Sequence, residues 1–406
     1  MRKQERNNIM TISFLAVTLL SCMVTVCLQM TVTAMPLLVV DMGLSRTLAG
    51  STTTVCTLAA LLFRPFSASL SKRMGERRAA LYGGVLYLVL FLWYLFCDAI
   101  PIIFLIRGLQ GIGMSLLTTA LGSMATAMIP QEQMTKGMGY FGLGNAVAVS
   151  IGPAIGLWLV EFGGYPAVFL AGAVMSAVIL LILLFLKEER KRLEATNKES
   201  QEHVPGGESR KSFGRLVIES GSLAPSLMSM LIIFSQTALT TYLSFLGESR
   251  GILKVGTFFT LNVFGMIFSR LFVGAVCERY GEKFLGAGAT MLLSGAYLLV
   301  AFAEHSWMVD MAGILYGFGY GAFYSILNAA AVRNSTAENR GAANAVFFGA
   351  KDMGTAAGAL LWGMLLEKSS YTEIYIACAG LSVVSFIYYL IQGRGGRIEA
   401  KIQKAK

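Results

Sequence analysis

Residues 64–77 read Arg64-Pro-Phe-Ser-Ala-Ser-Leu-Ser-Lys-Arg73-Met-Gly75-Glu76-Arg77, and a similar stretch returns at residues 270–283 as Arg270-Leu-Phe-Val-Gly-Ala-Val-Cys-Glu-Arg279-Tyr-Gly281-Glu282-Lys283. The interval is about half of the 406-residue chain. Further landmarks recur at nearly the same interval: Gln29 with Gln236, Gly111 and Gly113 with Gly317 and Gly319, and Gly152 and Gly156 with Gly354 and Gly358. A self-similarity of this length predicts a duplicated architecture.

The composition of the chain indicates a membrane protein. Only 14% of the residues are charged, 55% are hydrophobic and the mean hydropathy is +0.64, whereas a soluble domain is about one quarter charged. The formal net charge of +10 does not indicate nucleic-acid binding, because the basic residues lie in short loops between apolar runs. Two similar halves in such a chain predict a transporter whose substrate site lies where the repeats meet.

The apolar runs predict the fold. A membrane-spanning helix needs roughly 20 mostly apolar residues, whereas a barrel would need alternating strands of about ten residues, and we find none. We predict an all-α membrane protein with twelve transmembrane helices in two pseudo-symmetric six-helix bundles. The spans are expected near residues 10–38, 47–70, 79–98, 101–129, 137–161, 165–187, 222–246, 255–277, 284–303, 307–332, 340–366 and 371–392.

Hydrophilic segments divide the chain into parts. We expect an N-terminal six-helix bundle at 1–187, a cytoplasmic linker at 188–220, a C-terminal six-helix bundle at 221–393 and a basic cytoplasmic tail at 394–406. The linker holds few apolar residues that could form the core of a regulatory domain. The tail is expected to face lipid headgroups.

The Lys and Arg residues predict the orientation. Most of the 33 fall in the tails, the linker and the loops on one side, whereas Arg46, Arg250, Lys254 and Lys368 fall on the other. By the positive-inside rule, both termini are cytoplasmic. The basic N-terminus leads into a run too long for a signal peptide, so we expect a multi-pass protein of the plasma membrane that keeps its first span.

Several motifs resemble those of the major facilitator superfamily over essentially the whole chain. Arg64-Pro65 followed by residues 72–78 resembles that family's loop signature, and residues 274–283 resemble its second copy. Arg107-Gly-x-Gln110-Gly111-x-Gly113 resembles the motif of proton-coupled members, and Gly152-Pro153-x-x-Gly156 resembles an element of proton-exchanging exporters. The chain departs from these patterns at Ala68, Lys72, Ala148 and Leu157.

The loops and the glycine-proline pair are candidate gating elements. A tight turn between spans favours glycine, and a neighbouring Arg or Lys can bind lipid phosphates or helix C-terminal carbonyls. Lys72, Arg77 and Arg78 fit either topology-setting charge or gating, and Gly152-Pro153 fits either a hinge or simple packing. The predicted gating residues are Arg64, Arg73, Gly75, Glu278, Arg279, Gly281, Gly152 and Pro153.

Ionisable residues inside spans are functional hypotheses by default, because a charge at bilayer depth is costly. Asp352 is the one acid that we place deep in a span, roughly 18 Å along its helix from Arg340. The resemblance implies that the second and eleventh helices face each other. We therefore predict an Arg64–Asp352 pair that closes the cytoplasmic side and opens when Asp352 is protonated; the alternative is a permanent structural ion pair.

Arg107 and Lys351 are the other notable charges within spans. The resemblance implies that Arg107, in addition to Asp352, takes part in proton coupling. The expected partners of Arg107 are carbonyls, Gln29 or an anionic substrate group. The alternative for Arg107 is a buried structural cation. Lys351 lies about 100° round the helix from Asp352 and contacts either substrate or a neighbouring acceptor.

Polar and aromatic residues at mid-depth are candidate substrate contacts, although each could equally join helices to one another. Tyr316, Tyr320 and Tyr324 recur every four residues on one face, which fits an aromatic wall or ordinary packing. The predicted substrate-binding residues are Gln29, Thr33, Asn145, Gln236, Thr240, Tyr324, Asn328 and Lys351.

These features predict a secondary active transporter that exports a small organic molecule, a drug or metabolite, in exchange for protons. The alternatives are a proton-coupled nutrient uptake symporter and, from a different class, a transport-dead receptor or sensor. We find no enzyme constellation, phosphate-cradling loop or metal-ligand spacing, so we predict no enzyme activity, no metal and no cofactor. The expected partners are a small-molecule substrate, protons and membrane lipids, and we expect a monomer.

Overall fold

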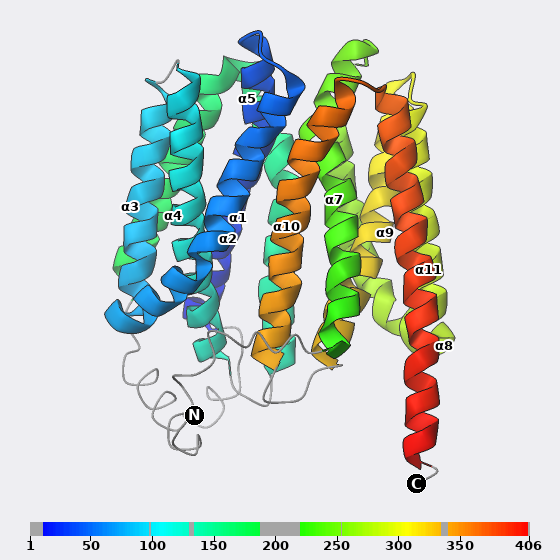
Figure 1. Cartoon of the computed structure of the whole chain (residues 1–406). Coiled ribbons are helices and arrows are strands. Elements are labelled where there is room, and N and C mark those ends of the chain that lie inside the picture. The colour runs from blue at the N-terminus through cyan, green and yellow to red at the C-terminus, as the bar shows by residue number, and fades with distance from the viewer. Residues whose placement is uncertain are drawn as a thin grey trace. The chain divides into compact units, whose positions relative to one another are not determined.

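The computed structural model describes residues 11–96, 99–129, 134–186, 220–252, 254–333 and 340–404 (Figure 1). These residues form helices joined by short turns, with no strand among them, which confirms the all-α prediction. In chain order the helices are α1 (Ile12–Asp41), α2 (Arg46–Met74), α3 (Glu76–Tyr94), α4 (Ile100–Met128), α5 (Met134–Phe185), α7 (Ser220–Ser249), α8 (Thr257–Ala301), α9 (Ser306–Arg333), α10 (Arg340–Leu366) and α11 (Tyr371–Lys404).

Two of these helices each contain two predicted spans, because a glycine turns the chain between them. In α5 the backbone leaves helical geometry at Gly163 and at Gly164, where φ is +69°. In α8 it does so at Gly281, where φ is +82°. Glycine adopts a positive φ without steric strain. With α5 and α8 divided at these points, each predicted span corresponds to one helical segment.

Fewer than twelve helical stretches qualify as membrane spans by length and hydropathy alone. In the described part of the chain, 6 helical stretches are both long and apolar enough to cross a membrane. The remaining predicted spans are shorter or carry more polar residues. Among them, α3 is 19 residues long and begins with Glu76-Arg77-Arg78, and α10 contains Lys351 and Asp352. The predicted linker lies almost entirely outside the described residues, and α11 continues through the segment predicted as the basic tail.

The chain forms two compact units. Unit 1 comprises Met1–Thr31, Ala59–Gly152 and Leu159–Leu216, and unit 2 comprises Val32–Leu58, Pro153–Trp158 and Val217–Lys406. The first part of α1, up to Thr31, therefore belongs to unit 1 and its remainder to unit 2. The first part of α2 belongs to unit 2 and its remainder to unit 1.

In unit 1, aromatic side chains pack α3 against α5. The rings of Tyr94 and Phe169 stack with centroids 4.9 Å apart, and Phe91 packs edge-on against Tyr94. Gly172 is where the backbone of α5 comes closest to Phe91, because a Cβ atom there would overlap the Phe91 ring. Burial of these large rings fixes how α3 and α5 pack.

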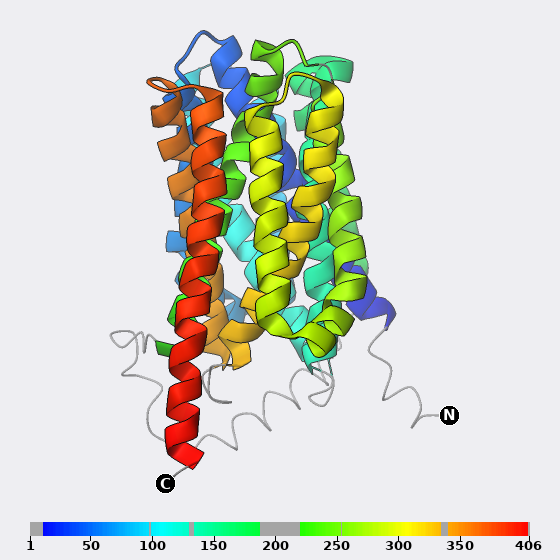
Figure 2. The same ribbon diagram turned by 90° about the vertical axis from the view of Figure 1, so that its right-hand side faces the viewer.

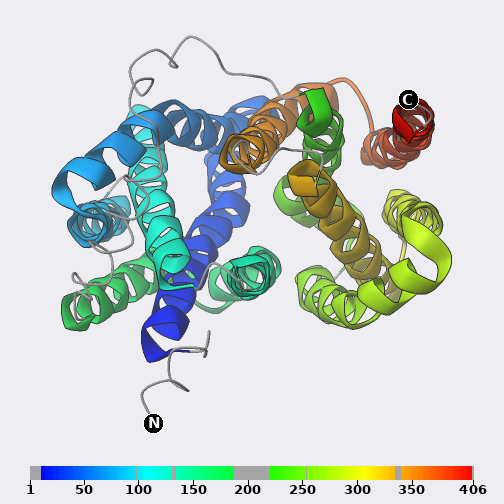
Figure 3. The ribbon, with the colours of Figure 1, turned by 90° about the horizontal axis from the view of Figure 1, so that it is seen from below.

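In unit 2, α9 packs on α8 and α7, α10 packs on α7, and α11 packs on α8 and α7. Figure 2 shows α8 and α9 side by side, and Figure 3 shows the helices of each unit along their axes. Phe258, Tyr297 and Tyr316 are fully buried between α8 and α9. The backbones of these two helices touch at Gly265, Gly313 and Gly317, as small residues permit between helices in lipid.

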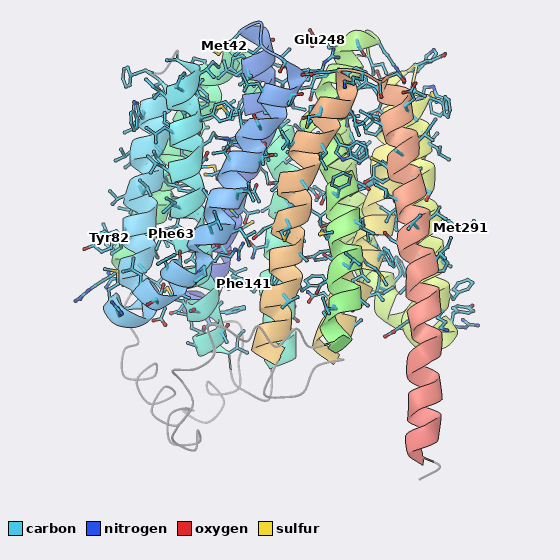
Figure 4. All side chains as sticks on the ribbon, viewed as in Figure 1. Met42, Phe63, Tyr82, Phe141, Glu248 and Met291 are labelled. Carbon is cyan, nitrogen blue, oxygen red and sulfur yellow. The ribbon has the colours of Figure 1, made fainter. Side chains whose placement is uncertain are left out.

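Large apolar side chains cover the surface of both units. Tyr82 of α3 and Met291 of α8 are 59% and 76% exposed and lie on the outer faces of their helices (Figure 4). Phe96, Phe162 and Phe185 are even more exposed. An apolar surface of this extent is typical of a protein whose solvent is the bilayer.

Two arginines bind the C-terminal carbonyls of neighbouring helices. In unit 1, Nε and Nη2 of Arg77 donate to the carbonyls of Leu183 and Leu184 at the end of α5, at 2.9 and 2.7 Å. In unit 2, Arg250 donates to the carbonyls of Ala301 and Ala303 at the end of α8, at 2.9 and 2.7 Å, and to Oγ1 of Thr372. A cation at a helix C-terminus satisfies orphan carbonyls and complements the helix dipole.

We expect Arg250→Met to lower the free energy of unfolding by about 2 kcal/mol, because it removes several charge-assisted hydrogen bonds at the end of α8. Denaturation of the purified protein in detergent measures this change. Arg78→Met is the matched control, because Arg78 is exposed on α3. Equal stabilities of the two variants would contradict a capping role for Arg250.

Candidate functional site

Arg107 of α4 lies at the centre of a buried polar network in unit 1. Its side chain has an exposed fraction of 0%. Nη1 donates to Oγ1 of Thr31 and to Oε1 of Gln110, both at 3.0 Å, and Nη2 donates to the carbonyl of Thr31 at 3.3 Å. The Tyr94 hydroxyl donates to the same Gln110 oxygen at 3.2 Å. The cation is thus held by neutral oxygens from α1 and α4.

The network agrees in part with the sequence prediction. A carbonyl was among the partners expected for Arg107, and the structure provides that of Thr31. The roles of Thr31 and Tyr94 were not predicted. The sequence could have identified Gln110 as a partner, because a residue three positions after Arg107 lies on the same face of the helix. The partners on α1 and α3 depend on how the helices pack, which one sequence does not reveal.

Asp352 is buried in α10, as its position in the sequence predicted, with an exposed fraction of 6%. The adjacent Lys351 is half-buried. Arg64, the partner predicted for Asp352, belongs to unit 1 and Asp352 to unit 2. The Arg64–Asp352 pair therefore stays a prediction.

The repeated loop motif forms the same turn in both halves. Gly75 separates α2 from α3 with a φ of +92°, and Gly281 turns α8 with a φ of +82°. Arg73 and Arg279 precede these glycines and are exposed, and the Arg279 guanidinium lies 5.3 Å from the ring centroid of Tyr280. The tight turns are thereby confirmed. The side chains of Glu278, Arg270 and Lys72 lie outside the described residues.

The repeated glycines of the fifth and eleventh spans form equivalent close contacts. A Cβ atom at Gly152 would lie 2.5 Å from Cβ of Gln29 on α1. In the second half, a Cβ at Gly354 would lie 2.5 Å from the carbonyl oxygen of Met230, and one at Gly358 would lie 2.7 Å from that of Phe234. Pro153, directly after Gly152, begins a segment of unit 2. The hinge role of Gly152 and Pro153 remains a prediction.

The predicted substrate residues of unit 1 lie in a polar seam between α1 and α5. Oδ1 of Asn145 accepts from the hydroxyls of Ser21 at 2.9 Å and Thr25 at 3.0 Å, and its amide donates to the Phe141 carbonyl. Nε2 of Gln29 donates to the Val149 carbonyl at 3.3 Å. These bonds fit the alternative in which Asn145 and Gln29 join helices.

The predicted substrate residues of unit 2 differ in burial. Thr33 and Gln236 are buried, whereas Thr240, Tyr324 and Asn328 are half-buried. Tyr316, Tyr320 and Tyr324 stack in sequence along α9, with centroids 5.7 and 5.4 Å apart. Since Tyr316 is only 1% exposed, packing explains its position, and Tyr324 is the more accessible end of the row.

Comparison with known sequences decides the family. The profile described as Major Facilitator Superfamily matches residues 17–253 and 225–405, which together cover nearly the whole chain. The chain belongs to the Major Facilitator Superfamily. The two matches overlap between the halves and together extend over the internal repeat. The resemblance inferred from the loop motifs is thereby confirmed, and the chain is a transporter of this family.

Curated relatives are distant but extend over most of the chain. The quinolone resistance protein NorA of Staphylococcus aureus is 18% identical over 366 residues, which cover 88% of this chain and 90% of that protein. The uncharacterized MFS-type transporter YddS of Bacillus subtilis is 23% identical over 372 residues, which cover 87% of this chain and 84% of that protein.

Solved structures share the fold. The nucleoside transporter NupG aligns with a TM-score of 0.69 at 15% identity, over 94% of this chain and 99% of that one. A POT family transporter in complex with 5-aminolevulinic acid aligns with a TM-score of 0.70 at 14% identity, over 93% and 95% of the two chains. These relatives and neighbours are transporters rather than enzymes, as predicted for this chain.

Proposed function

We propose that this transporter exports a small organic molecule in exchange for protons, with both termini in the cytoplasm of a cell whose plasma membrane it spans as a monomer. The observation that carries the proposal is the buried carboxyl group of Asp352 in a spanning helix. A carboxylate kept at such depth can take up and release a proton. The distant similarity to NorA, which is named for quinolone resistance, supports export of drug-like molecules.

In the proposed cycle, Asp352 binds a proton from the outer side and releases it to the cytoplasm, while substrate moves outward. Arg107 and its neutral partners hold a fixed positive charge in unit 1. Exchange of conformations by the two halves about a midplane site is the general mechanism of such repeats.

Inverted membrane vesicles with an imposed proton gradient test the proposal. We expect a quinolone to accumulate in these vesicles and the accumulation to collapse when the gradient is dissipated. Uptake accelerated by a gradient in right-side-out vesicles would instead support the nutrient symporter, the alternative function. Transport that is indifferent to any gradient would overturn proton coupling.

We expect Asp352→Asn to lower gradient-driven accumulation by at least about tenfold, because the amide cannot carry a proton. Exchange of labelled for unlabelled substrate without a gradient should persist, since the variant still binds substrate. Asp41→Asn, at the exposed last residue of α1, is the matched control and should transport normally. Full gradient-driven transport by Asp352→Asn would exclude Asp352 as the coupling residue.

A further inference from the structure

Lys283 occupies in unit 2 the position that Arg77 occupies in unit 1. Each residue follows the glycine of the repeated turn by two positions, Gly75 in the first half and Gly281 in the second. Arg77 donates to two carbonyls at the end of α5. These carbonyls need a donor from outside, because the helix stops there and provides no further amides. In unit 1 the cation of the turn therefore binds protein.

The corresponding helix of unit 2 does not stop at this point. The two carbonyls that Arg77 binds correspond to those of Tyr389 and Leu390, at the interval that separates Arg77 from Lys283. Both residues lie inside α11, which continues to Lys404, so each carbonyl accepts an amide four residues later in the same helix. No orphan carbonyl is left there for Lys283. Within the part of the chain that the structure describes, Lys283 has no hydrogen bond or ion pair.

A second cation and two aromatic rings lie beside Lys283 in the turn of α8. The Arg279 guanidinium lies 5.3 Å from the ring centroid of Tyr280, and the rings of Tyr280 and Phe284 have centroids 5.2 Å apart. Both rings are more than half exposed, and so is Arg279 on the same turn. Exposed aromatic rings next to Arg or Lys are typical of the boundary between water and hydrocarbon.

The lipid-facing side of α8 leads to this turn. Phe284, Met291 and Leu298 recur every seven residues along the second segment of α8, and all three are exposed. Figure 4 shows Met291 on the outer face of the helix. An apolar stripe that starts at the turn and runs along a spanning helix faces the acyl chains of the bilayer. The turn itself therefore lies at the level of the headgroups.

The neighbouring helix α11 adds positive charge near this level. It packs on α8 and extends beyond the turn of α8 (Figures 1 and 2). Arg394 and Arg397 follow Leu390 in this helix, about 6 and 10 Å further along at 1.5 Å per residue. Glu282 of the turn is half-buried and has a partner of its own. Residues 278–283 and 390–397 together hold four cations and two acids, a net positive charge.

We propose that the turn of α8 and the adjoining stretch of α11 bind the headgroup phosphate of an anionic phospholipid. Lys283 and Arg279 bind the phosphate oxygens, the Tyr280 ring holds Arg279 in place, and Phe284 lies against the first carbons of the acyl chains. Cations beside a bilayer attract anionic headgroups, which makes the charge complementary. The inference goes beyond the proposed function, because the site involves no substrate, no coupling ion and no direction of transport.

Native mass spectrometry of the full chain in detergent measures this site. Phosphatidylglycerol is titrated against the protein, and phosphatidylcholine, which carries a phosphate but no net charge, is the comparison lipid. We expect the parent to bind phosphatidylglycerol more tightly than phosphatidylcholine. Lys283→Gln and Arg279→Gln should each weaken the tightest binding of phosphatidylglycerol by about fivefold, the effect of one cation beside an anionic surface. Lys283→Arg should keep it.

Two further variants are controls. Lys254→Gln is matched in chemistry to Lys283→Gln, because Lys254 is exposed just before α8, at the other end of the segment that leads to Gly281. It should bind phosphatidylglycerol as the parent does. Arg77→Gln tests the contrast between the two halves. It should lower stability, because the carbonyls at the end of α5 lose their donor, and it should leave the affinity for phosphatidylglycerol unchanged.

Equal affinity of the parent, Lys283→Gln and Arg279→Gln for phosphatidylglycerol would overturn the site. Equal binding of the two lipids by the parent would overturn the choice of an anionic headgroup. Displacement of the lipid by inorganic phosphate would assign the site to free phosphate and overturn the lipid assignment. These measurements use neither substrate nor proton gradient. A failure of proton-driven export in vesicles would therefore refute the proposed function while leaving the lipid site standing.

Discussion

Gly317→Leu will separate α9 from the first segment of α8 and destabilise unit 2 by about 3 kcal/mol or more. A Cβ atom at Gly317 would overlap the carbonyl oxygen of Asn262 and lie 2.9 Å from the Met266 amide nitrogen. Both are backbone atoms within a helix, so neither can turn aside as a flexible side chain would. The helices must move apart instead.

Neighbouring glycines make this separation propagate along the helix pair. A Cβ at Gly313 would lie 2.5 Å from the Phe258 carbonyl oxygen, and one at Gly265 would lie 2.5 Å from that of Ile314. In lipid no hydrophobic force restores the contact, because tails and side chains are equally apolar. Loss of the close contact at Gly317 therefore also weakens the packing at Gly313 and Gly265.

Thermal unfolding of the purified protein, followed by size-exclusion chromatography after heating, checks this prediction. Gly317→Ala should already destabilise, although less than Gly317→Leu. Gly288→Ala is the matched control on α8, because a Cβ there meets nothing within 4 Å. If Gly317→Leu unfolds at the temperature of this control, the backbone contact between α8 and α9 does not exist in the protein.

The sequence predicted much of this fold for physical reasons that operate locally. Apolar runs long enough to span a bilayer predicted every helix, since the membrane imposes their length. The repeat also predicted the turns at Gly75 and Gly281, because a positive φ favours glycine wherever it occurs. The recurrence of Gly111 and Gly113 as Gly317 and Gly319 predicted the duplicated architecture.

Contacts between distant segments could not be predicted in the same way. The glycines of α9 did not reveal that Asn262 and Phe258 of α8 oppose them. Arg107 was expected to need acceptors, but Thr31 and Tyr94 become its network only through the packing of α1 and α3 on α4. The inclusion of residues 32–58 in unit 2 likewise follows from packing between distant segments, which residue patterns do not specify.

Arg107→Met will lower transport without a matching loss of stability. We expect the variant to lose transport by at least about tenfold while its free energy of unfolding stays within about 1 kcal/mol of the parent value or rises. Arg107 is a fully buried cation held by neutral oxygens, and within the described residues its Nε atom has no hydrogen-bond partner. Replacing such a charge with an apolar side chain of similar length removes a desolvation penalty as well as hydrogen bonds.

The remaining network explains why little stability is lost. In Arg107→Met, Oε1 of Gln110 still accepts from the Tyr94 hydroxyl, and Nε2 of Gln110 still donates to Oγ1 of Thr31 at 3.3 Å. Denaturation in detergent and transport in vesicles measure the two quantities on the same preparation. Arg250→Met is the informative contrast, because the capping role predicts lower stability with normal transport per folded molecule. A parallel loss of transport and stability in Arg107→Met would show instead that Arg107 is a structural cation, retained for the packing of α1 on α4.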